Sequence, residues 1–421
     1  MHPPQRRARV VFVIGRGGGG HKASARAVRD SLPESLRDAV EFLDGGYAIE
    51  ACLLGKKEPR ASGWDCDEVY NFMLRHGFAC VASFLGLGAR FIANACRSRI
   101  IRGLTRLWSA TSGGCVPQMV VSFVPHINAV MREALAEVNP EATYVTVVTD
   151  FASSPEHCWI EPYEHARGAN HLIVAGTSML VRQCADLGYP ETQVLSTGGM
   201  VVHPCFYTSP PVSSVSSGRA ERADRAVISF GAMPPMRVES IVDALARAQP
   251  HLELIVLCGG NAALLEKLRA RGDVTAEPMA SAERVRELMR SASMIVGKPG
   301  PGTVSEAIAC GTAFVSERRD VMVQERDVLQ WLEETGTGVV VDSLTSVPYD
   351  LSARVAACAD QVRKQADSNR AVFEVRDLLV RCLMLHADSD CEQGTVETQP
   401  PLKRPQLDRS PLAGLNGQRG G

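Results

Sequence analysis

Short apolar segments alternate with glycine-containing turns and helical patterns along most of this chain. The clearest example joins the apolar run Val10–Ile14 through Gly15–Gly20 to the helical pattern of Lys22–Leu32. A strand, a tight turn and a helix in that order form the repeating unit of a mostly parallel sheet covered by helices. The chain is therefore expected to fold as an α/β protein.

The alternation occurs in two blocks of similar size. In the first block the predicted strands are Val10–Ile14, Val40–Leu43, Met119–Ser122, Tyr144–Val148, His171–Ala175 and Val194–Thr197. In the second block they are Ala226–Phe230, Leu252–Leu257, Met294–Val296, Ala313–Val315 and Gly338–Val341. A chain of 421 residues is longer than a domain with a single hydrophobic core usually is, so we predict two Rossmann-like α/β domains.

The composition of the chain changes at two places, which we predict to be domain boundaries. Residues 208–224 (TSPPVSSVSSGRAERAD) are rich in serine, proline and charge, as interdomain linkers are. Residues 387–421 contain few apolar side chains, so a disordered tail is expected. Residues 1–207 are assigned to an N-terminal domain, and residues 225–386 to a C-terminal domain closed by the helical stretch Leu351–His386.

Charge and cysteine content exclude several classes of protein. The 45 basic and 47 acidic residues nearly balance, which argues against a general nucleic-acid binder. The 13 cysteines include no Cys-x-x-Cys pair, so we predict no metal site and a reducing compartment. No apolar run approaches the roughly 20 residues of a membrane-spanning helix. The first strand begins so early that we expect no leader peptide, and a cytoplasmic protein that associates peripherally with a membrane.

The first glycine turn can be interpreted in three ways. Gly15, Gly17 and Gly20 satisfy the Gly-x-Gly-x-x-Gly pattern of dinucleotide-binding enzymes, which leaves an NAD-binding oxidoreductase open. The P-loop pattern fails, because His21 stands where a lysine is required. The glycines could also serve close packing alone. A ligand-binding turn would expose backbone N–H groups, Gly20 among them, at a helix N-terminus suited to an anion.

His21 is the first candidate catalytic residue, because it begins the helix that follows this turn. The helix dipole disfavours the imidazolium there, which would leave a neutral ring able to accept a proton. The alternative is a histidine that only caps or packs.

A second turn follows the strand Met294–Val296 and reads Lys298-Pro-Gly300-Pro-Gly302-Thr303. Its prolines and glycines predict a rigid turn that exposes the start of the next helix. A lysine beside bare helix N–H groups is typical of a diphosphate site, and Glu306 one turn later could hold ribose hydroxyls. Thr303 and Glu306 also match a capping box, which is a purely structural alternative.

Together these motifs resemble a known family. GGGHKASARAV at 18–28, KPGPGTVSEA at 298–307 and the pair Gln324-Glu325 look like the monogalactosyldiacylglycerol synthases. That family includes processive diacylglycerol glucosyltransferases, and the murein-pathway lipid N-acetylglucosaminyltransferase is a more distant relative. The resemblance covers roughly residues 9–345 in order, with VSFVPHIN at 121–128 and VVTDF at 147–151 among the intermediate matches. It implies a GT-B architecture, with two domains facing each other across a cleft.

The resemblance also implies roles for individual residues. His21 resembles the general base, and Trp159 resembles an aromatic on the lipid-facing side, although a core tryptophan is an equal interpretation. Asp150 is assigned to the acceptor side, and it is the first candidate base if His21 is not the base. Gly302 and Thr303 resemble the diphosphate contacts, Glu306 the ribose contact, and Gln324 and Glu325 the sugar contacts. We also assign Gly20, Gly231, Lys298 and Gly300 to donor binding. The turn Gly231-Ala-Met-Pro-Pro235 and Val328 depart from the family pattern.

An arginine-rich segment suggests a membrane-facing surface. Between Val69 and Trp108 there are six arginines, Arg97, Arg99 and Arg102 among them, and no acidic residue. Cationic, apolar segments of this kind bind anionic lipid surfaces. The alternative is a helix pair with an ordinary solvated basic face.

The sequence therefore predicts an inverting glycosyltransferase that moves galactose or glucose from a UDP-hexose to a lipid alcohol, with 1,2-diacylglycerol as the expected acceptor. We expect no cofactor, no metal and no nucleic-acid partner. Three alternatives stay open: a transferase for another lipid or polyprenyl acceptor, an NAD-binding oxidoreductase, and a catalytically inactive homologue.

Overall fold

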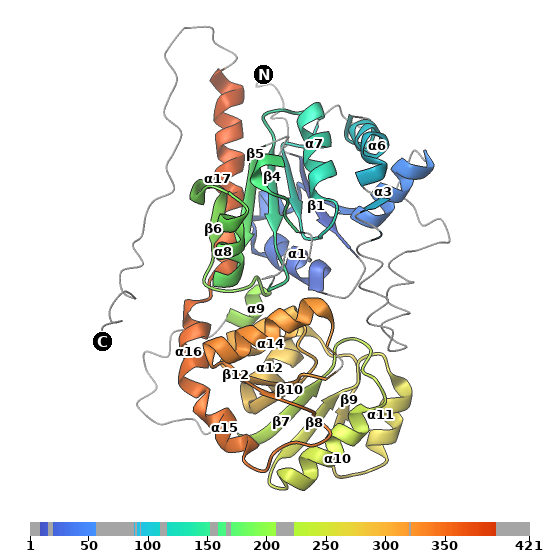
Figure 1. Ribbon diagram of the computed structural model, residues 1–421, viewed down its shortest axis with the longest axis vertical. Helices are drawn as coiled ribbons and strands as arrows, with labels where there is room; N and C mark the ends of the chain where they lie inside the picture. Colours follow the sequence, from blue (N-terminus) through green and yellow to red (C-terminus); the bar gives the residue numbers. More distant parts are fainter. Residues whose placement is uncertain are drawn as a thin grey trace, which may run out of the picture.

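Two parallel sheets of six strands each form the framework of the protein, which confirms the predicted pair of α/β domains. A computed structural model describes residues 9–15, 20–55, 88, 91–92, 94–109, 116–151, 159–165, 170–207, 223–319 and 321–392. The strand orders are β2-β1-β3-β4-β5-β6 and β12-β11-β10-β7-β8-β9. Figure 1 shows the two sheets one above the other, each with helices on both faces.

The first sheet matches every strand predicted for the first block. Its strands are β1 (Val10–Ile14), β2 (Val40–Asp44), β3 (Met119–Ser122), β4 (Thr143–Val147), β5 (Asn170–Ala175) and β6 (Val194–Ser196). Its described helices are α1 (Gly20–Ser31), α2 (Glu34–Arg37), α3 (Gly45–Leu54), α6 (Arg97–Ser109), α7 (Asn128–Val138), α8 (Ser178–Asp186) and α9 (Pro204–Tyr207). The inner strands are buried on both faces, as parallel strands between two helix layers are.

The second sheet contains one strand that the sequence did not reveal. Its strands are β7 (Ala223–Ser229), β8 (Glu253–Leu257), β9 (Thr275–Glu277), β10 (Ala292–Gly297), β11 (Ala313–Glu317) and β12 (Gly338–Val341). The helices between them are α10 (Val238–Ala248), α11 (Ala262–Arg269), α12 (Ala282–Ser291), α13 (Pro301–Ala309) and α14 (Val323–Thr335). The missed strand is β9, which has three residues, too few to show periodicity.

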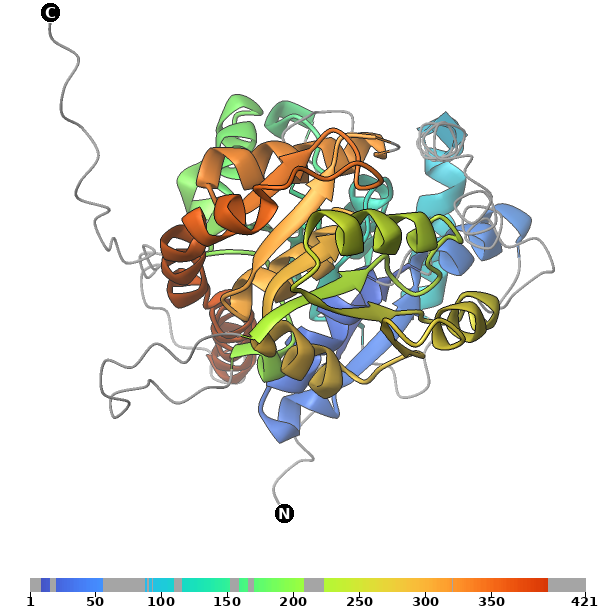
Figure 2. The same cartoon turned by 90° about the horizontal axis from the view of Figure 1, so that it is seen from below.

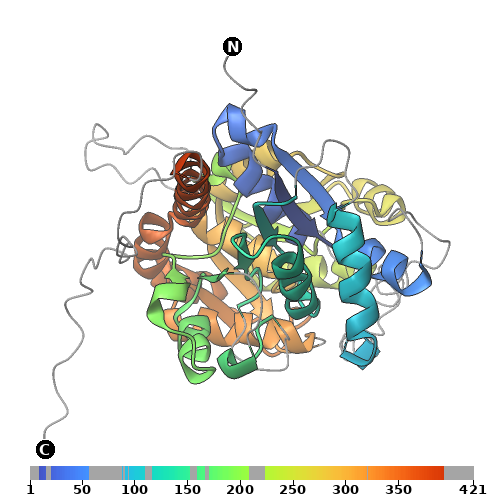
Figure 3. The same cartoon turned by 90° about the horizontal axis from the view of Figure 1, so that it is seen from above.

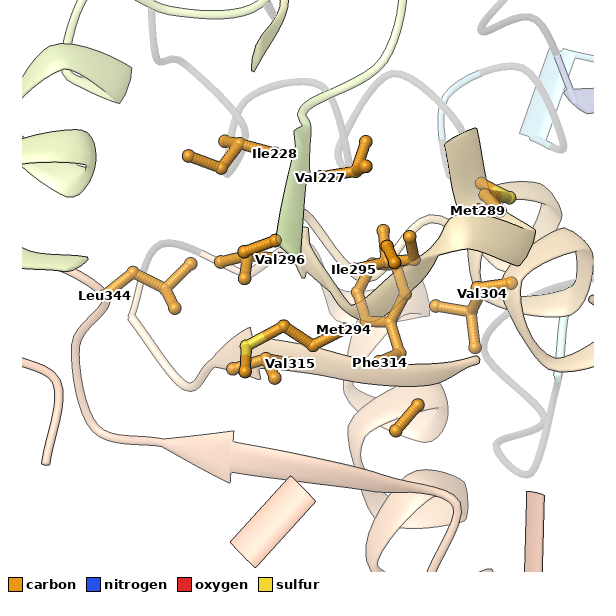
Figure 4. Close-up of a cluster of buried hydrophobic side chains, with 14 of the residues drawn as sticks. Val227, Ile228, Met289, Met294, Ile295, Val296, Val304, Phe314, Val315 and Leu344 are labelled. Atoms are coloured by element: carbon orange, nitrogen blue, oxygen red, sulfur yellow. The ribbon is translucent and has the colours of Figure 1, made fainter. Parts of the chain in front are cut away.

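The core of the second domain fixes where β10 ends. Figure 4 shows Val227 of β7 on the same side of the sheet as Ile295 of β10, Phe314 of β11 and Val304 of α13, with Ile228 on the opposite side of β7. All of these side chains belong to one buried apolar cluster. Gly297 ends β10 so close to β7 that an added Cβ would lie 1.8 Å from the Ser229 carbonyl oxygen. No larger residue fits there, so the turn that follows Gly297 starts tight against β7.

The C-terminal helices correct one predicted boundary. Helices α15 (Leu351–Ala357) and α16 (Ala359–Ser368) lie beside the second sheet, but α17 (Ala371–Glu392) runs along the first sheet (Figure 1). Val372, Val375 and Leu379 of α17 share a core cluster with the first sheet. The sequence predicts that residues 351–386 close the second domain and that the tail begins at 387, whereas the helix continues to Glu392. Residues 208–222 of the predicted linker and 393–421 of the predicted tail lie outside the described residues.

Asn369 connects the crossing segments at the start of α17. Its Nδ2 donates to the Met200 carbonyl over 3.1 Å, and its Oδ1 accepts from the Tyr207 hydroxyl over 3.1 Å. Viewed from the first-domain end, α17 and α6 lie on opposite sides of the first sheet (Figure 3). The opposite view shows α15 and α16 at the side of the second domain (Figure 2).

Candidate active site

Each sheet has one point at which its strand order reverses. The chain leaves β1 for β2 on one side and later returns to β3 on the other, and the same reversal separates β7 from β10. In open parallel sheets, ligands bind outside the carboxyl ends of the strands at this point. The two predicted glycine turns follow β1 and β10, and their helices α1 and α13 contact each other. The fold therefore brings both motifs to one region.

His21 lies in the first turn of α1, and its ring is held from the end of β4. Its Nδ1 is 2.9 Å from Oγ1 of the buried Thr149, and its ring centroid is 5.8 Å from that of Trp159. A ring whose Nδ1–H donates to a hydroxyl keeps the Nε2 lone pair as proton acceptor. Residues 16–19 of the glycine turn, Gly17 included, lie outside the described residues.

Trp159 and Asp150 interact with each other beside His21. The indole Nε1–H donates to Asp150 Oδ2 over 2.8 Å, and the Asn128 amide donates to the Trp159 carbonyl over 2.9 Å. Trp159 is only 1% exposed. The structure therefore favours the core interpretation of this tryptophan over a lipid-facing one.

A pocket of about 410 Å³ lies beyond Trp159, within the first domain. Two ion pairs, Arg97–Glu133 and Arg132–Glu161, form part of its wall. This volume is in the usual range for small-ligand sites. The lining residues are Asn94, Arg97, His126, Asn128, Ala129, Arg132, Glu133, Trp159, Ile160, Glu161, Pro162, His165 and His171.

Arg132 organises the buried side of this pocket. It is 2% exposed, pairs with Glu161, and its Nη1 donates to His171 Nδ1 over 2.9 Å. Because guanidinium only donates, Nδ1 must accept, so Nε2–H of His171 donates to Thr146 Oγ1 over 2.9 Å. Burial first, and then the Arg132 charge, lower the pKa of His171 well below its usual range. The imidazole is therefore neutral.

The turn after β10 is open on the side where a ligand would approach. The Gly300 N–H donates to the Lys298 carbonyl over 2.7 Å, and Gly300 caps α13 with no side-chain cap hydrogen bond. A Cβ on Gly300 or Gly302 would meet nothing within 4 Å. The capping box that was the alternative for Thr303 and Glu306 does not form, so both side chains are left for other roles.

Glu306 is a partly buried carboxyl group at the junction between α13 and the first domain. Burial raises its pKa to about 7, and its charge acts on Cys205 of α9. Among the described residues, no group donates a hydrogen bond to this carboxyl. A carboxyl group without a hydrogen-bond donor lowers the stability of the folded protein. Its oxygens are therefore available to accept a hydrogen bond from a ligand hydroxyl.

The Glu325 side chain is buried and pairs with Lys298, although the family resemblance implies that it contacts the sugar. Its Oε1 lies 2.8 Å from Lys298 Nζ, and its Oε2 accepts the Met322 N–H over 3.3 Å. The two predicted donor residues thus pair with each other. Gln324 belongs to α14, but its side chain lies outside what the structure describes.

The structure shows the conformation of the Gly231–Pro235 turn and the burial of Val328, the two places where the sequence departs from the family pattern. Gly231 has a φ of 82°, which favours glycine, and an added Cβ there would meet nothing within 4 Å. The turn after it is tied to the β8–α11 loop, because the Gly260 N–H donates to the Ala232 carbonyl over 2.8 Å. Val328 is fully buried in the second core, so this position faces the interior.

The arginines predicted to face a membrane separate into two groups. Arg97 pairs with Glu133 at 2.6 Å and lines the pocket, so a carboxylate of the protein already balances its charge, while its membrane contact stays a prediction. Arg99, Arg102 and Arg106 are exposed on α6, whose opposite face buries Ile100 and Leu104. Just before α6, Phe91 is 73% exposed. Most of residues 56–93 lie outside the described part of the chain. Within the described part, no helix is long and apolar enough to cross a membrane.

Sequence reasoning missed three features of this site. Thr149 stands directly before Asp150, so the VVTDF match pointed to its position but not to its contact with His21. The burial of Arg132 and the Lys298–Glu325 pair had no sequence signal, because each joins residues from separate elements.

Comparisons with known proteins agree with the fold and with the resemblance found in the motifs. No family model matches the chain. Monogalactosyldiacylglycerol synthase 2 of Arabidopsis thaliana is 23% identical over 393 residues, which cover 88% of this chain and 80% of that protein. The Streptomyces glycosyltransferase SsfS6, solved with thymidine diphosphate, has a TM-score of 0.53 at 16% identity, over 89% of this chain and 99% of its own. A putative UDP-N-acetylglucosamine 2-epimerase of Listeria monocytogenes has a TM-score of 0.52 at 13% identity, over 94% and 99%. The fold is therefore GT-B, which transferases share with other nucleotide-sugar enzymes, and the predicted resemblance to the monogalactosyldiacylglycerol synthases is confirmed.

Proposed function

We propose that this protein is a glycosyltransferase that moves galactose or glucose from a UDP-hexose to the hydroxyl of a lipid alcohol, with 1,2-diacylglycerol as acceptor. The observation that supports this best is the meeting of the two glycine-turn helices, α1 with His21 and α13 with Glu306. Sequence similarity to monogalactosyldiacylglycerol synthases along most of the chain supports the same chemistry. An NAD-dependent oxidoreductase would leave the second turn without a role.

In the proposed reaction, His21 acts on the acceptor. The Nε2 lone pair takes the proton of the acceptor hydroxyl while its oxygen attacks the anomeric carbon of the hexose. The bond from that carbon to the UDP oxygen breaks on the opposite face, so the configuration inverts. The Thr149 hydroxyl holds the ring at Nδ1, and histidine keeps the proton until solvent removes it.

The second domain binds and stabilises the leaving group in this proposal. The Glu306 carboxylate accepts hydrogen bonds from the ribose hydroxyls, and the diphosphate lies at the open turn of Gly300 and Gly302. The α13 N-terminus and the Lys298 ammonium offset the negative charge that develops on UDP. The step so drawn requires no metal ion or cofactor.

The donor site predicts a pH-dependent UDP affinity. At low pH Glu306 is protonated and loses an acceptor for the ribose diol, so UDP affinity should fall as the pH decreases through about 7. Glu306→Gln should weaken UDP binding about tenfold at pH 8, as loss of a charge-assisted hydrogen bond does. Its affinity should also vary little between pH 6 and 8. Isothermal titration calorimetry measures both quantities, with Glu266→Gln on the exposed side of α11 as the control. Equal UDP affinities for parent and Glu306→Gln at pH 8 would remove Glu306 from the donor site.

We also propose that α6 and the segment before it rest on an anionic membrane surface. Replacing the exposed Arg99, Arg102 and Arg106 with glutamine should reduce binding to phosphatidylglycerol vesicles at least about tenfold at low salt, at roughly 1 kcal/mol for each charge. The loss should be smaller at high salt, because salt screens exposed charges. Vesicle sedimentation checks this result. The control replaces three exposed arginines on other elements, Arg269, Arg354 and Arg381. Equal losses for the two triple variants would show that only net charge matters.

A further inference from the structure

Lys298 and Glu325 form an ion pair whose two members differ greatly in exposure. The Lys298 side chain is 38% exposed and that of Glu325 only 2%, with 2.8 Å between Nζ and Oε1. The second carboxylate oxygen accepts the Met322 N–H. Both oxygens are thus used inside the protein, whereas the ammonium group has no second partner among the described residues.

The surroundings of Lys298 are rigid on the backbone side as well. Gly297 is pressed against the Ser229 carbonyl, and the Gly300 N–H closes a tight turn on the Lys298 carbonyl. The Lys298 residue is therefore held at both ends: the turn fixes its backbone, and the buried Glu325 carboxylate of α14 holds its ammonium group. Lysine has a long, flexible side chain, so without Glu325 nothing described here would hold the charge in one place.

We propose that Glu325 is a positioning residue that acts through Lys298. It holds the ammonium beside the start of α13, where the charge meets the diphosphate of the donor, and it does not touch the sugar. This inference rests on the proposed function, because it assigns a partner to the leaving-group cation. It differs from the sugar contact that the family resemblance implies for Glu325.

The two roles predict different ligand dependence. A sugar contact affects UDP-hexose binding but not the binding of UDP, which has no sugar. A residue that positions Lys298 for the diphosphate affects UDP and UDP-hexose alike. It has little effect on UMP, which lacks the second phosphate.

Calorimetry on the full chain with UMP, UDP and UDP-glucose tests the proposal. Glu325→Gln and Lys298→Met should each weaken UDP and UDP-glucose about tenfold, with UMP affinity changed less than about twofold. The double variant should be no weaker than either single variant, because the two residues act as one unit. Glu333→Gln is the control, since Glu333 lies on the same helix and pairs with the exposed Arg318.

If Glu325→Gln does not fold, Glu325→Asp takes its place, because aspartate keeps the buried negative charge and a carboxylate oxygen that can accept the Met322 N–H. Its shorter side chain should move the ammonium and weaken UDP while sparing UMP. Unchanged UDP affinity with weakened UDP-glucose would overturn the proposal in favour of the sugar contact, and additive losses in the double variant would also overturn it. If the parent protein binds none of the three nucleotides, the proposed function itself fails.

Discussion

Replacing His21 with asparagine should lower the turnover of sugar transfer at least about 100-fold, the lower end for loss of a general base. Asparagine has a polar group of similar reach, but it has no basic nitrogen that could take the proton of the acceptor hydroxyl, as Nε2 of His21 does. The affinity for UDP should change less than about twofold, because the proposed donor contacts lie in the other domain. Steady-state rates with saturating donor, together with UDP calorimetry, separate the two effects.

The control for His21→Asn is His251→Asn, at an exposed histidine of the second domain. Near-normal turnover in the His21→Asn enzyme would reduce His21 to a packing role against Thr149. Asp150 would then be the next candidate base, although one of its oxygens already accepts the Trp159 indole N–H.

Replacing Arg132 with methionine should destabilise the first domain by about 3–5 kcal/mol, the usual result of removing one member of a buried ion pair. Methionine fills much of the space, so the loss would come from the unpaired Glu161 carboxylate and from His171 Nδ1 without its donor. Urea unfolding followed by tryptophan fluorescence measures the change, since Trp108 and Trp159 are both buried in this domain.

Two further variants show whether burial is the reason. Arg225→Met breaks a more exposed pair with Glu253, and it should cost no more than about 1 kcal/mol. Adding Glu161→Gln to Arg132→Met should restore part of the stability, because it removes the unpaired charge. Equal losses for Arg132→Met and Arg225→Met would contradict this account of the pocket wall.

The sequence predicted the sheets well because parallel strands covered by helices are short, apolar and regularly spaced. It placed α17 wrongly, since an amphipathic helix at the end of a chain does not reveal which of two sheets it covers. The apolar positions Val372, Val375 and Leu379 would have suited either core.

Among the site residues, the glycine turns were predictable because tight turns at helix starts require particular residue types. Pairings between distant elements were not. Arg97 looked like a surface cation in a segment without acids, yet its partner Glu133 lies 36 positions away on α7. Lys298 and Glu325 were predicted as separate ligand contacts, and only the fold shows that they pair. The sequence motifs thus indicate which residues lie at the site. Burial and ion pairing in the folded protein decide which of those side chains can contact a ligand.

A transfer assay with UDP-galactose and UDP-glucose against vesicles of diacylglycerol and phosphatidylglycerol tests the proposed glycosyltransferase activity itself. We expect a hexosyl-diacylglycerol product of inverted anomeric configuration and one UDP released for each sugar transferred, in the parent protein but not in His21→Asn. Release of UDP at the same rate without diacylglycerol, or conversion of the UDP-sugar into an isomer with no glycolipid formed, would contradict it.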